Sequence, residues 1–288
     1  MKYEKPQPGN PNMLTIRQHV IPARSLGRFT NIDGFVQVST ANAINNVLSL
    51  KPSNKFFTLA RVWDQRSESG WMKQIEDSFQ TLVDDILSKR IVSVAGENIA
   101  TVAYFFSLWY WRSRQEPQIE TELQFKGITG SSLTHEEEEQ LEKRYIMFAR
   151  LGGRVPARFL TGLNLQKQTD EYAHSIKDWT WGIIQAKSGE FLMPDVPNYG
   201  FLPISPKVLL AANHPNGMIL KTHLKKINIA LLSYTWKYFI ARNIGTAMSG
   251  ISIRDIKKSV KARDKQLAGG ASFQGSIAAA ADQHKSTA

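Results

Sequence analysis

Residues 179–215 constrain the fold more than any other stretch of this sequence. Four short runs of β-branched and aromatic residues follow one another there, and Gly, Pro, Asn and Ser residues separate them. Such runs, bounded by turn-forming residues, are typical of a small antiparallel sheet. A further run at residues 35–39 follows Asp33-Gly34, where glycine supplies the positive φ that a tight turn requires. We therefore expect residues 35–39 to join the strands of 179–212 in one sheet.

The rest of the chain is predicted to be mainly helical. Apolar residues recur every three or four positions within residues 61–90, which predicts one buried stripe on a helix. Residues 97–114 are apolar on nearly every face, as in a helix at the middle of a domain. A third helix starts after Thr134, a favourable N-cap followed by a run of glutamates, and further helices are expected at residues 158–175 and 220–244. The sequence thus predicts an α+β fold, with helices packed on a small antiparallel sheet.

The two ends of the chain differ in composition from its middle. Residues 1–14 are polar and rich in Pro, Gly and Asn, and residues 250–288 consist largely of Ala, Gly, Ser, Lys and Gln. Segments with so few apolar residues do not bury enough surface to offset the entropy lost on ordering. We expect a flexible lead-in at 1–14, a single α+β domain at 15–249 and a disordered basic tail at 250–288.

Two apolar segments, residues 91–111 and 227–244, are long enough to be compared with membrane spans. Charged residues interrupt both, whereas a spanning helix needs about 20 consecutive and mostly uncharged residues. We therefore expect buried helices and no integral membrane segment. The N-terminus has no apolar signal core, and this feature, together with the absence of cysteine, predicts a cytoplasmic protein.

The chain carries 36 Lys and Arg residues against 25 Asp and Glu residues, a formal net charge of +11. A balance this basic favours contact with a polyanion, either nucleic acid or an anionic membrane surface. The lack of cysteine excludes a disulfide framework and a thiolate metal site, and no two histidines share a ligand-like spacing, so we expect no metal site. No P-loop, dinucleotide fingerprint or nucleophile elbow occurs, so the sequence identifies no cofactor.

His19 and Asp195 are the first two candidate catalytic residues. His19 stands just before a helix start at Pro22, where its imidazole can act as a general base near neutral pH or simply fix the path of the chain through one hydrogen bond. Asp195 lies between two prolines at the end of a predicted strand, so its direction is restricted. It is either a preorganised site residue or a turn former that accepts backbone hydrogen bonds. The catalytic interpretation predicts that the two side chains lie close together.

Asp64 and Glu68 form a second candidate pair. They fall with Arg61 and Arg66 within two helical turns. Carboxylates and guanidinium groups at this spacing usually pair with each other on a solvated face. The functional alternative is a carboxylate pair used for metal binding or acid–base chemistry.

Four basic residues are candidates for nucleic-acid binding. Arg112 and Arg114 follow a run of Trp and Tyr residues, a combination that suits phosphate contact beside stacked bases, although most of these rings are expected in the core. Lys225 and Lys226 add positive charge near the start of the last predicted helix.

Several of these residues fall in motifs that resemble a known family. The opening Gln18-His19-x-x-Pro22, followed by Leu26-x-x-Phe29 and Asp33-Gly34, resembles a bacterial and phage family of unknown function whose members begin Gln-His-Tyr-x-Pro. An acidic helix, an aromatic helix and a strand leading to a Ser-Asp-x-Pro element follow in that family, and residues 17–244 are similar in order.

Two positions depart from the pattern of that family. Val20 stands in place of the usual tyrosine, and Pro194 stands in place of the serine before Asp195. If that serine works in the site of the family, this protein has lost it. The resemblance implies an α+β fold and the candidate positions His19 and Asp195, but no assigned activity.

Two functions remain open from the sequence. One is an intracellular, prophage-borne protein that binds or acts on nucleic acid, in phage defence or host takeover; the resemblance and the basic charge motivate it. The other is a non-catalytic interaction module that binds a host protein.

Overall fold

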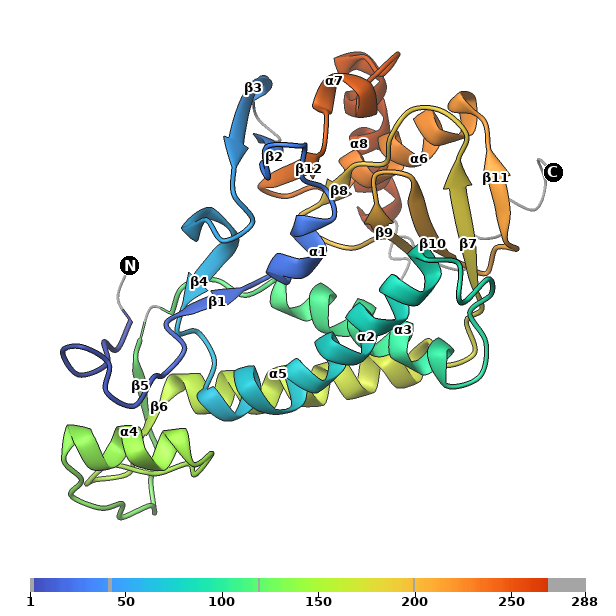
Figure 1. Ribbon diagram of the computed structural model, residues 1–288. Helices are drawn as coiled ribbons and strands as arrows, with labels where there is room; N and C mark the ends of the chain where they lie inside the picture. Colours follow the sequence, from blue (N-terminus) through green and yellow to red (C-terminus); the bar gives the residue numbers. More distant parts are fainter. Residues whose placement is uncertain (1–2, 41–42, 119, 199, 269–288) are drawn as a thin grey trace. The chain divides into compact units, whose positions relative to one another are not determined.

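Short strands and helices of moderate length make up the computed structural model, which describes residues 3–40, 43–118, 120–198 and 200–268. Helices occur together with small antiparallel sheets (Figure 1), so the predicted α+β class is confirmed. Contacts group the chain into two compact units, Met1–Pro22 with Asn54–Phe79 and Ala103–Ile176, and Ala23–Ser53 with Gln80–Val102 and Lys177–Ala288. The expectation of a single domain at 15–249 stays a prediction.

The first unit combines two short antiparallel strand pairs with several helices. The strand pairs are β1 (Arg17–His19) with β4 (Thr58–Ala60), and β5 (Glu122–Gln124) with β6 (Arg154–Pro156). The helical elements are η1 (Lys55–Phe57), the π-helical turn η2 (Ser67–Trp71), the start of α2 (Met72–Leu87), the end of α3 (Glu97–Arg112), α4 (His135–Lys143) and α5 (Ala157–Ser175). Residues from α2, α3 and α5 and from the loop between β4 and η2 meet in an apolar cluster of Val62, Trp63, Met72, Leu108 and Leu165.

The N-cap predicted at Thr134 is present. Its hydroxyl accepts the N–H of Glu137, and the Glu137 carboxylate accepts the N–H of Thr134, which completes a capping box at the start of α4. Three further glutamates of α4, Glu138, Glu139 and Glu142, are buried. Helix α4 therefore presents carboxylates to the interior of the unit.

The second unit contains the sheet predicted for residues 179–212. Strands β7 (Trp181–Ala186), β10 (Val208–Ala212) and β9 (Phe201–Ser205) pair antiparallel in that order, and β11 (Gly217–Ile219) adds a parallel edge. A second sheet has the order β3 (Ala43–Leu50), β2 (Val36–Thr40), β12 (Tyr238–Ala241) and β8 (Met193–Pro194), all antiparallel. The strand expected at 35–39 is thus real; it shares this second sheet with β8 from residues 179–212, but not the sheet of β7, β9 and β10.

Strand β12 lies where the sequence predicts the end of a long helix. Helix α6 (Lys221–Ser233) stops well before residue 244, and the buried run Tyr238–Ala241 then pairs with β2 and β8. A short apolar run that is buried on all sides does not distinguish strand from helix by its periodicity, which explains the error. The apolar core of this unit draws residues from both sheets and from α6.

The smaller helices of the second unit are α1 (Ala23–Gly27), α7 (Ile244–Ala247) and α8 (Ile253–Ala268). Helix α8 lies within the segment that the sequence assigns to a disordered tail. It is amphipathic, and Ile256 and Val260 pack against the core of the unit. The remainder of that segment, residues 269–288, lies outside the described residues.

The N-terminal lead-in is also held in place from residue 3 to residue 14. The Glu4 carboxylate forms ion pairs, the Gln7 and Asn12 side chains donate to Glu139, and Leu14 is only 3% exposed. The flexibility expected of residues 1–14 from their composition stays a prediction. Within the described ranges, no helix combines the length and the apolar character that crossing a bilayer requires.

Candidate functional site

His19 lies at the end of β1 in the first unit, in register with Thr58 of β4. The preceding Gln18 is buried and ties the strand to the next segment: its side-chain oxygen accepts the N–H groups of Val62 and Trp63 at 2.7 and 3.1 Å, and its amide donates to the Trp63 carbonyl at 2.7 Å. Because side chains alternate along a strand, the His19 imidazole points to the opposite face from Gln18. It is half-buried.

Asp195 lies in the second unit, directly after β8. Its carboxylate accepts the backbone N–H groups of Trp236, Lys237 and Tyr238 at 2.9, 2.6 and 3.4 Å, and the residue is 5% exposed. Burial raises the pKa of the Asp195 carboxyl, against the opposing effect of the three N–H groups. This is the arrangement of a turn-forming acid, one of the two alternatives that the sequence left open. Since His19 belongs to the other unit, the proximity of the two side chains stays a prediction.

Glu68 lies on the π-helical turn η2 and is held by an indole and a guanidinium. The Trp63 indole N–H donates to Glu68 Oε2 at 2.6 Å, and Arg112 Nη2 lies 3.6 Å from the same oxygen. Burial raises the pKa of the Glu68 carboxyl, against the opposing effect of the Arg112 charge. A carboxyl with a raised pKa on a π-helical turn is suited to proton transfer.

Asp64 is enclosed more completely than Glu68. Its carboxylate accepts the Ser67 N–H at 3.3 Å and lies 3.6 Å from Arg66 Nε. Burial raises the pKa of Asp64. The pairing with Arg66 is the one expected from their spacing, but it lies in the interior rather than on a solvated face. Catalytic roles for Asp64 and Glu68 stay predictions, and among the described residues no three His, Asp or Glu side chains gather as a metal ion would need.

Arg112 does not lie on a nucleic-acid-binding surface. Its side chain is 2% exposed, it forms an ion pair with Glu76, and its guanidinium lies over the Trp63 ring at 5.2 Å. A buried and neutralised guanidinium has no access to a phosphate group, so this prediction is wrong. Arg114 stacks on Tyr110, 3.2 Å from the ring centroid, and donates to the Tyr110 carbonyl at 2.8 Å.

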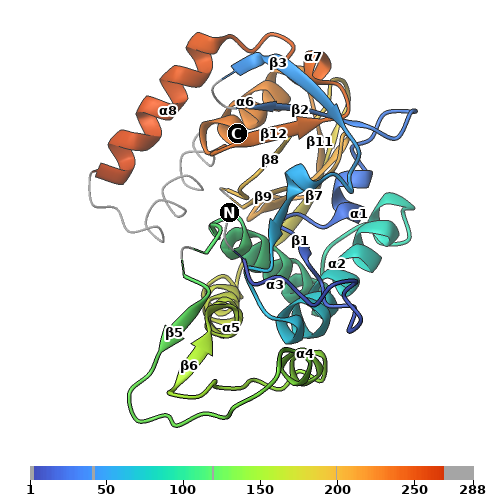
Figure 2. The same ribbon diagram turned by 90° about the vertical axis from the view of Figure 1, so that its left-hand side faces the viewer.

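Lys225 and Lys226 lie on α6, beside a second basic helix. Figures 1 and 2 show α8 next to α6, and the Lys225 ammonium lies 3.3 Å from the Asp255 carboxylate of α8. On α8, basic residues occupy positions 254, 257, 258 and 261, spacings of three and four that put them on one stripe. We define the α6–α8 basic surface as Lys221, Lys225, Lys226, Arg254, Lys257, Lys258 and Lys261.

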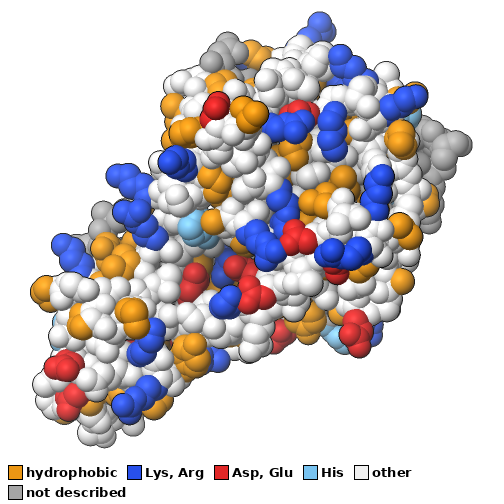
Figure 3. Space-filling view, in the orientation of Figure 1, with side chains coloured by type: hydrophobic (Ala, Val, Ile, Leu, Met, Phe, Trp, Pro, Cys, Tyr) orange, Lys and Arg blue, Asp and Glu red, His pale blue; other side chains and the backbone are white. Residues whose placement is uncertain are grey.

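Six residues of the α6–α8 basic surface are exposed, and Lys225 is half-buried. By contrast, basic and acidic side chains are interspersed over much of the face visible in Figure 3. The sequence prediction included only Lys225 and Lys226. The other basic residues on α8 could have been found from their spacing around Ile256 and Val260. Apolar and basic residues that alternate in this way form two stripes, which indicates an amphipathic helix rather than a disordered tail.

Comparison of the chain with protein-family models, with curated proteins and with solved structures gives no match. The resemblance to the bacterial and phage family therefore stays a prediction.

Proposed function

We propose that this protein binds nucleic acid through the α6–α8 basic surface of its second unit. The observation that supports the proposal is the charge of two adjacent helices: among the side chains that the structure describes on α6 and on α8 as far as Lys261, seven are Lys or Arg and one, Asp255, is a carboxylate. Ammonium and guanidinium groups at high density attract the phosphate backbone and release its condensed counterions.

The composition of this surface also supports one mode of binding. Lysine contacts phosphate as a point charge, and contacts to phosphate position a protein on nucleic acid without reading its sequence. The proposed binding therefore has little sequence preference and weakens steeply with salt.

Fluorescence anisotropy with labelled single- and double-stranded DNA and RNA tests this proposal. The test variant is the triple substitution Lys257→Gln, Lys258→Gln and Lys261→Gln. The plot of log affinity against log salt has a negative slope, and each lost phosphate contact should make it shallower by about 0.9 on duplex DNA or about 0.7 on single strands. Loss of all three contacts would reduce the duplex slope by about 2.7.

The matched control carries the same three changes of charge elsewhere, at the exposed Lys55, Lys89 and Lys126. Its slope should stay close to that of the wild-type protein. An equal loss in test and control variants would show that net charge, not this surface, attracts the nucleic acid. The absence of binding to all four nucleic acids at low salt would refute the proposal and favour the alternative function, a module that binds a host protein.

A further inference from the structure

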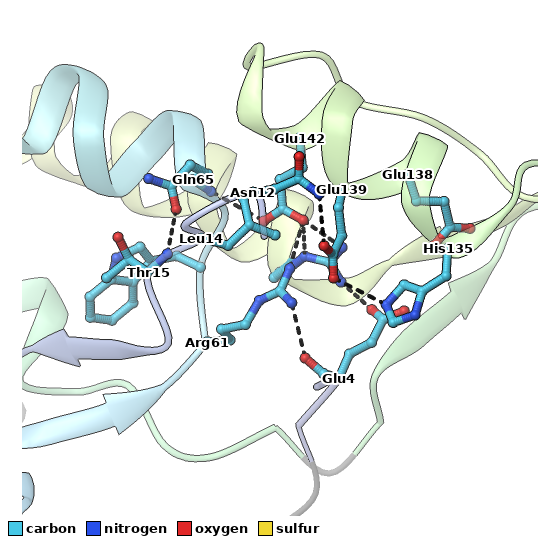
Figure 4. Close-up of polar contacts among 12 residues, drawn as sticks. Glu4, Asn12, Leu14, Thr15, Arg61, Gln65, His135, Glu138, Glu139 and Glu142 are labelled. Carbon is cyan, nitrogen blue, oxygen red and sulfur yellow. Dashed lines mark hydrogen bonds and ion pairs between the residues drawn. The ribbon is translucent and has the colours of Figure 1, made fainter. Parts of the chain in front are cut away.

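The N-terminal segment, residues 3–14, lies against buried charged residues of the first unit (Figure 4). Glu4 is at the centre of these contacts. Its carboxylate forms ion pairs with Arg150 and Arg158, and its backbone carbonyl accepts a hydrogen bond from Arg61 Nη1 at 3.1 Å. Three arginines from separate parts of the chain thus bind one residue.

Each of these arginines also has carboxylate partners outside the N-terminal segment. Glu142 lies 2.7 Å from both Arg61 Nη2 and Arg158 Nη2. Arg150 pairs with Glu138 at 2.6 Å and with Glu122 at 2.9 Å. These three glutamates bond to the three arginines and orient their guanidinium groups. The donors directed at Glu4 are therefore held in place by residues other than Glu4.

With the N-terminal segment in place, the arginine donors are also shielded from water. The side chains of Arg61 and Arg158 are 2% and 5% exposed, and that of Arg150 is 16% exposed. Hydrogen bonds between a guanidinium and a carboxylate are directional and are stronger when water is excluded. The three arginines thus make a preformed site for a carboxylate that arrives on an extended peptide, because Arg61 binds the peptide carbonyl beside it.

The N-terminal segment is attached mainly by polar contacts. Beyond Glu4, the Gln7 N–H and the Asn12 side chain donate to Glu139 at 2.6 and 3.0 Å, and the side chain of Gln7 adds a bond at 3.2 Å. Leu14 is the residue of the segment that is buried in the core. Asn10 and Met13 adopt φ values of 49° and 48°; asparagine is common in this left-handed region, whereas methionine is rare there. Segments with few buried apolar contacts are, in general, those that open locally before a whole domain unfolds.

We propose that Arg61, Arg150 and Arg158 form a peptide carboxylate site that the chain occupies with its own Glu4. When the N-terminal segment detaches, the same site binds an extended segment of another protein that carries a glutamate or aspartate. The segment acts as an intramolecular competitor, because its attachment to the chain keeps its local concentration high. This site lies in the first unit and is independent of the nucleic-acid surface proposed above.

The full chain with Glu4→Gln tests this proposal. The substitution keeps the shape of the side chain but removes the charge that pairs with Arg150 and Arg158. The probe is a fluorescein-labelled peptide with the sequence of residues 1–12, and the control probe is the same peptide with Glu4→Gln. We expect the Glu4 peptide to bind the Glu4→Gln protein at least about 10-fold more tightly than the wild-type protein, the effect of one charge-assisted hydrogen bond.

A second variant tests the site itself. Adding Arg150→Gln to Glu4→Gln should abolish the gain, and circular dichroism verifies that each variant is folded. Arg150 is chosen because its side chain is the most exposed of the three. Equal binding of both probes, or equal binding to the wild-type and Glu4→Gln proteins, would overturn the proposal. Displacement of the bound peptide by a DNA oligonucleotide but not by an unlabelled acidic peptide would also overturn it.

Discussion

Replacement of Gly162 by alanine measures how closely α5 packs on the buried Asp64 carboxylate. A Cβ at residue 162 would lie 2.1 Å from Asp64 Oδ1 and 2.3 Å from Ser67 Oγ, closer than real Cβ atoms approach other heavy atoms. Asp64 and Ser67 are both fully buried. Either these side chains or the helix must therefore move to admit one methyl group.

Two effects of opposite sign determine the size of the change. Alanine is more favourable than glycine inside a helix by about 0.8–1.0 kcal/mol, whereas overpacking a well-packed interior typically costs about 1–3 kcal/mol. Displacement of Asp64 also weakens its contacts with Arg66 and the Ser67 N–H. We expect the free energy of unfolding to fall by about 1–2 kcal/mol in Gly162→Ala.

Urea unfolding followed by circular dichroism measures this difference. Gly27→Ala is the matched control, because Gly27 also lies in a helix but a Cβ there would meet no atom within 4 Å. We expect the control to be unchanged or up to about 1 kcal/mol more stable. In an Asp64→Ala background, the cost of Gly162→Ala should fall by about 1 kcal/mol. Equal stability changes in the two glycine variants would refute the close packing of α5 on Asp64.

Three further predictions concern Glu4, Asp195 and Ile256. Burial raises the pKa of the Glu4 carboxyl, but the charges of Arg158 and Arg150 outweigh this effect and lower that pKa below its usual value. The ion pairs of Glu4 therefore stabilise the fold above the usual pKa, and this stabilisation is lost as the pH falls through the lowered pKa of the folded state. The urea midpoints of the wild-type and Glu4→Gln proteins should differ at pH 7 and converge in acid. Asp195→Ala should destabilise the protein by about 2 kcal/mol, because buried N–H groups lose a charged acceptor; an unchanged urea midpoint would contradict the turn-forming role. Ile256→Ala should detach α8 from α6, and hydrogen exchange and proteolysis of residues 253–268 should then become faster. Ile253→Ala, at an exposed position of the same helix, should leave both rates unchanged.

Local signals in the sequence predicted the parts of the fold that depend on neighbouring residues. The runs of 179–212 became β7, β9 and β10, because alternating turn-forming and β-branched residues favour strands wherever they occur. The N-cap at Thr134 was predictable for the same reason, since a capping box joins residues three positions apart. Lys225 and Lys226 were predicted as basic surface residues because a charged side chain is exposed by default.

Tertiary structure alone decided the features that depend on distant residues. Arg112 looks like a surface residue after an aromatic run, but Glu76 and Glu68, 36 and 44 positions earlier, neutralise it in the interior. Glu4 looks like part of a mobile end, but its partners Arg150 and Arg158 are 146 and 154 positions away. Composition predicts disorder where a segment has little apolar surface of its own. Composition cannot predict that the rest of the unit presents arginines to a carboxylate of that segment. Those arginines come together only when the unit has folded.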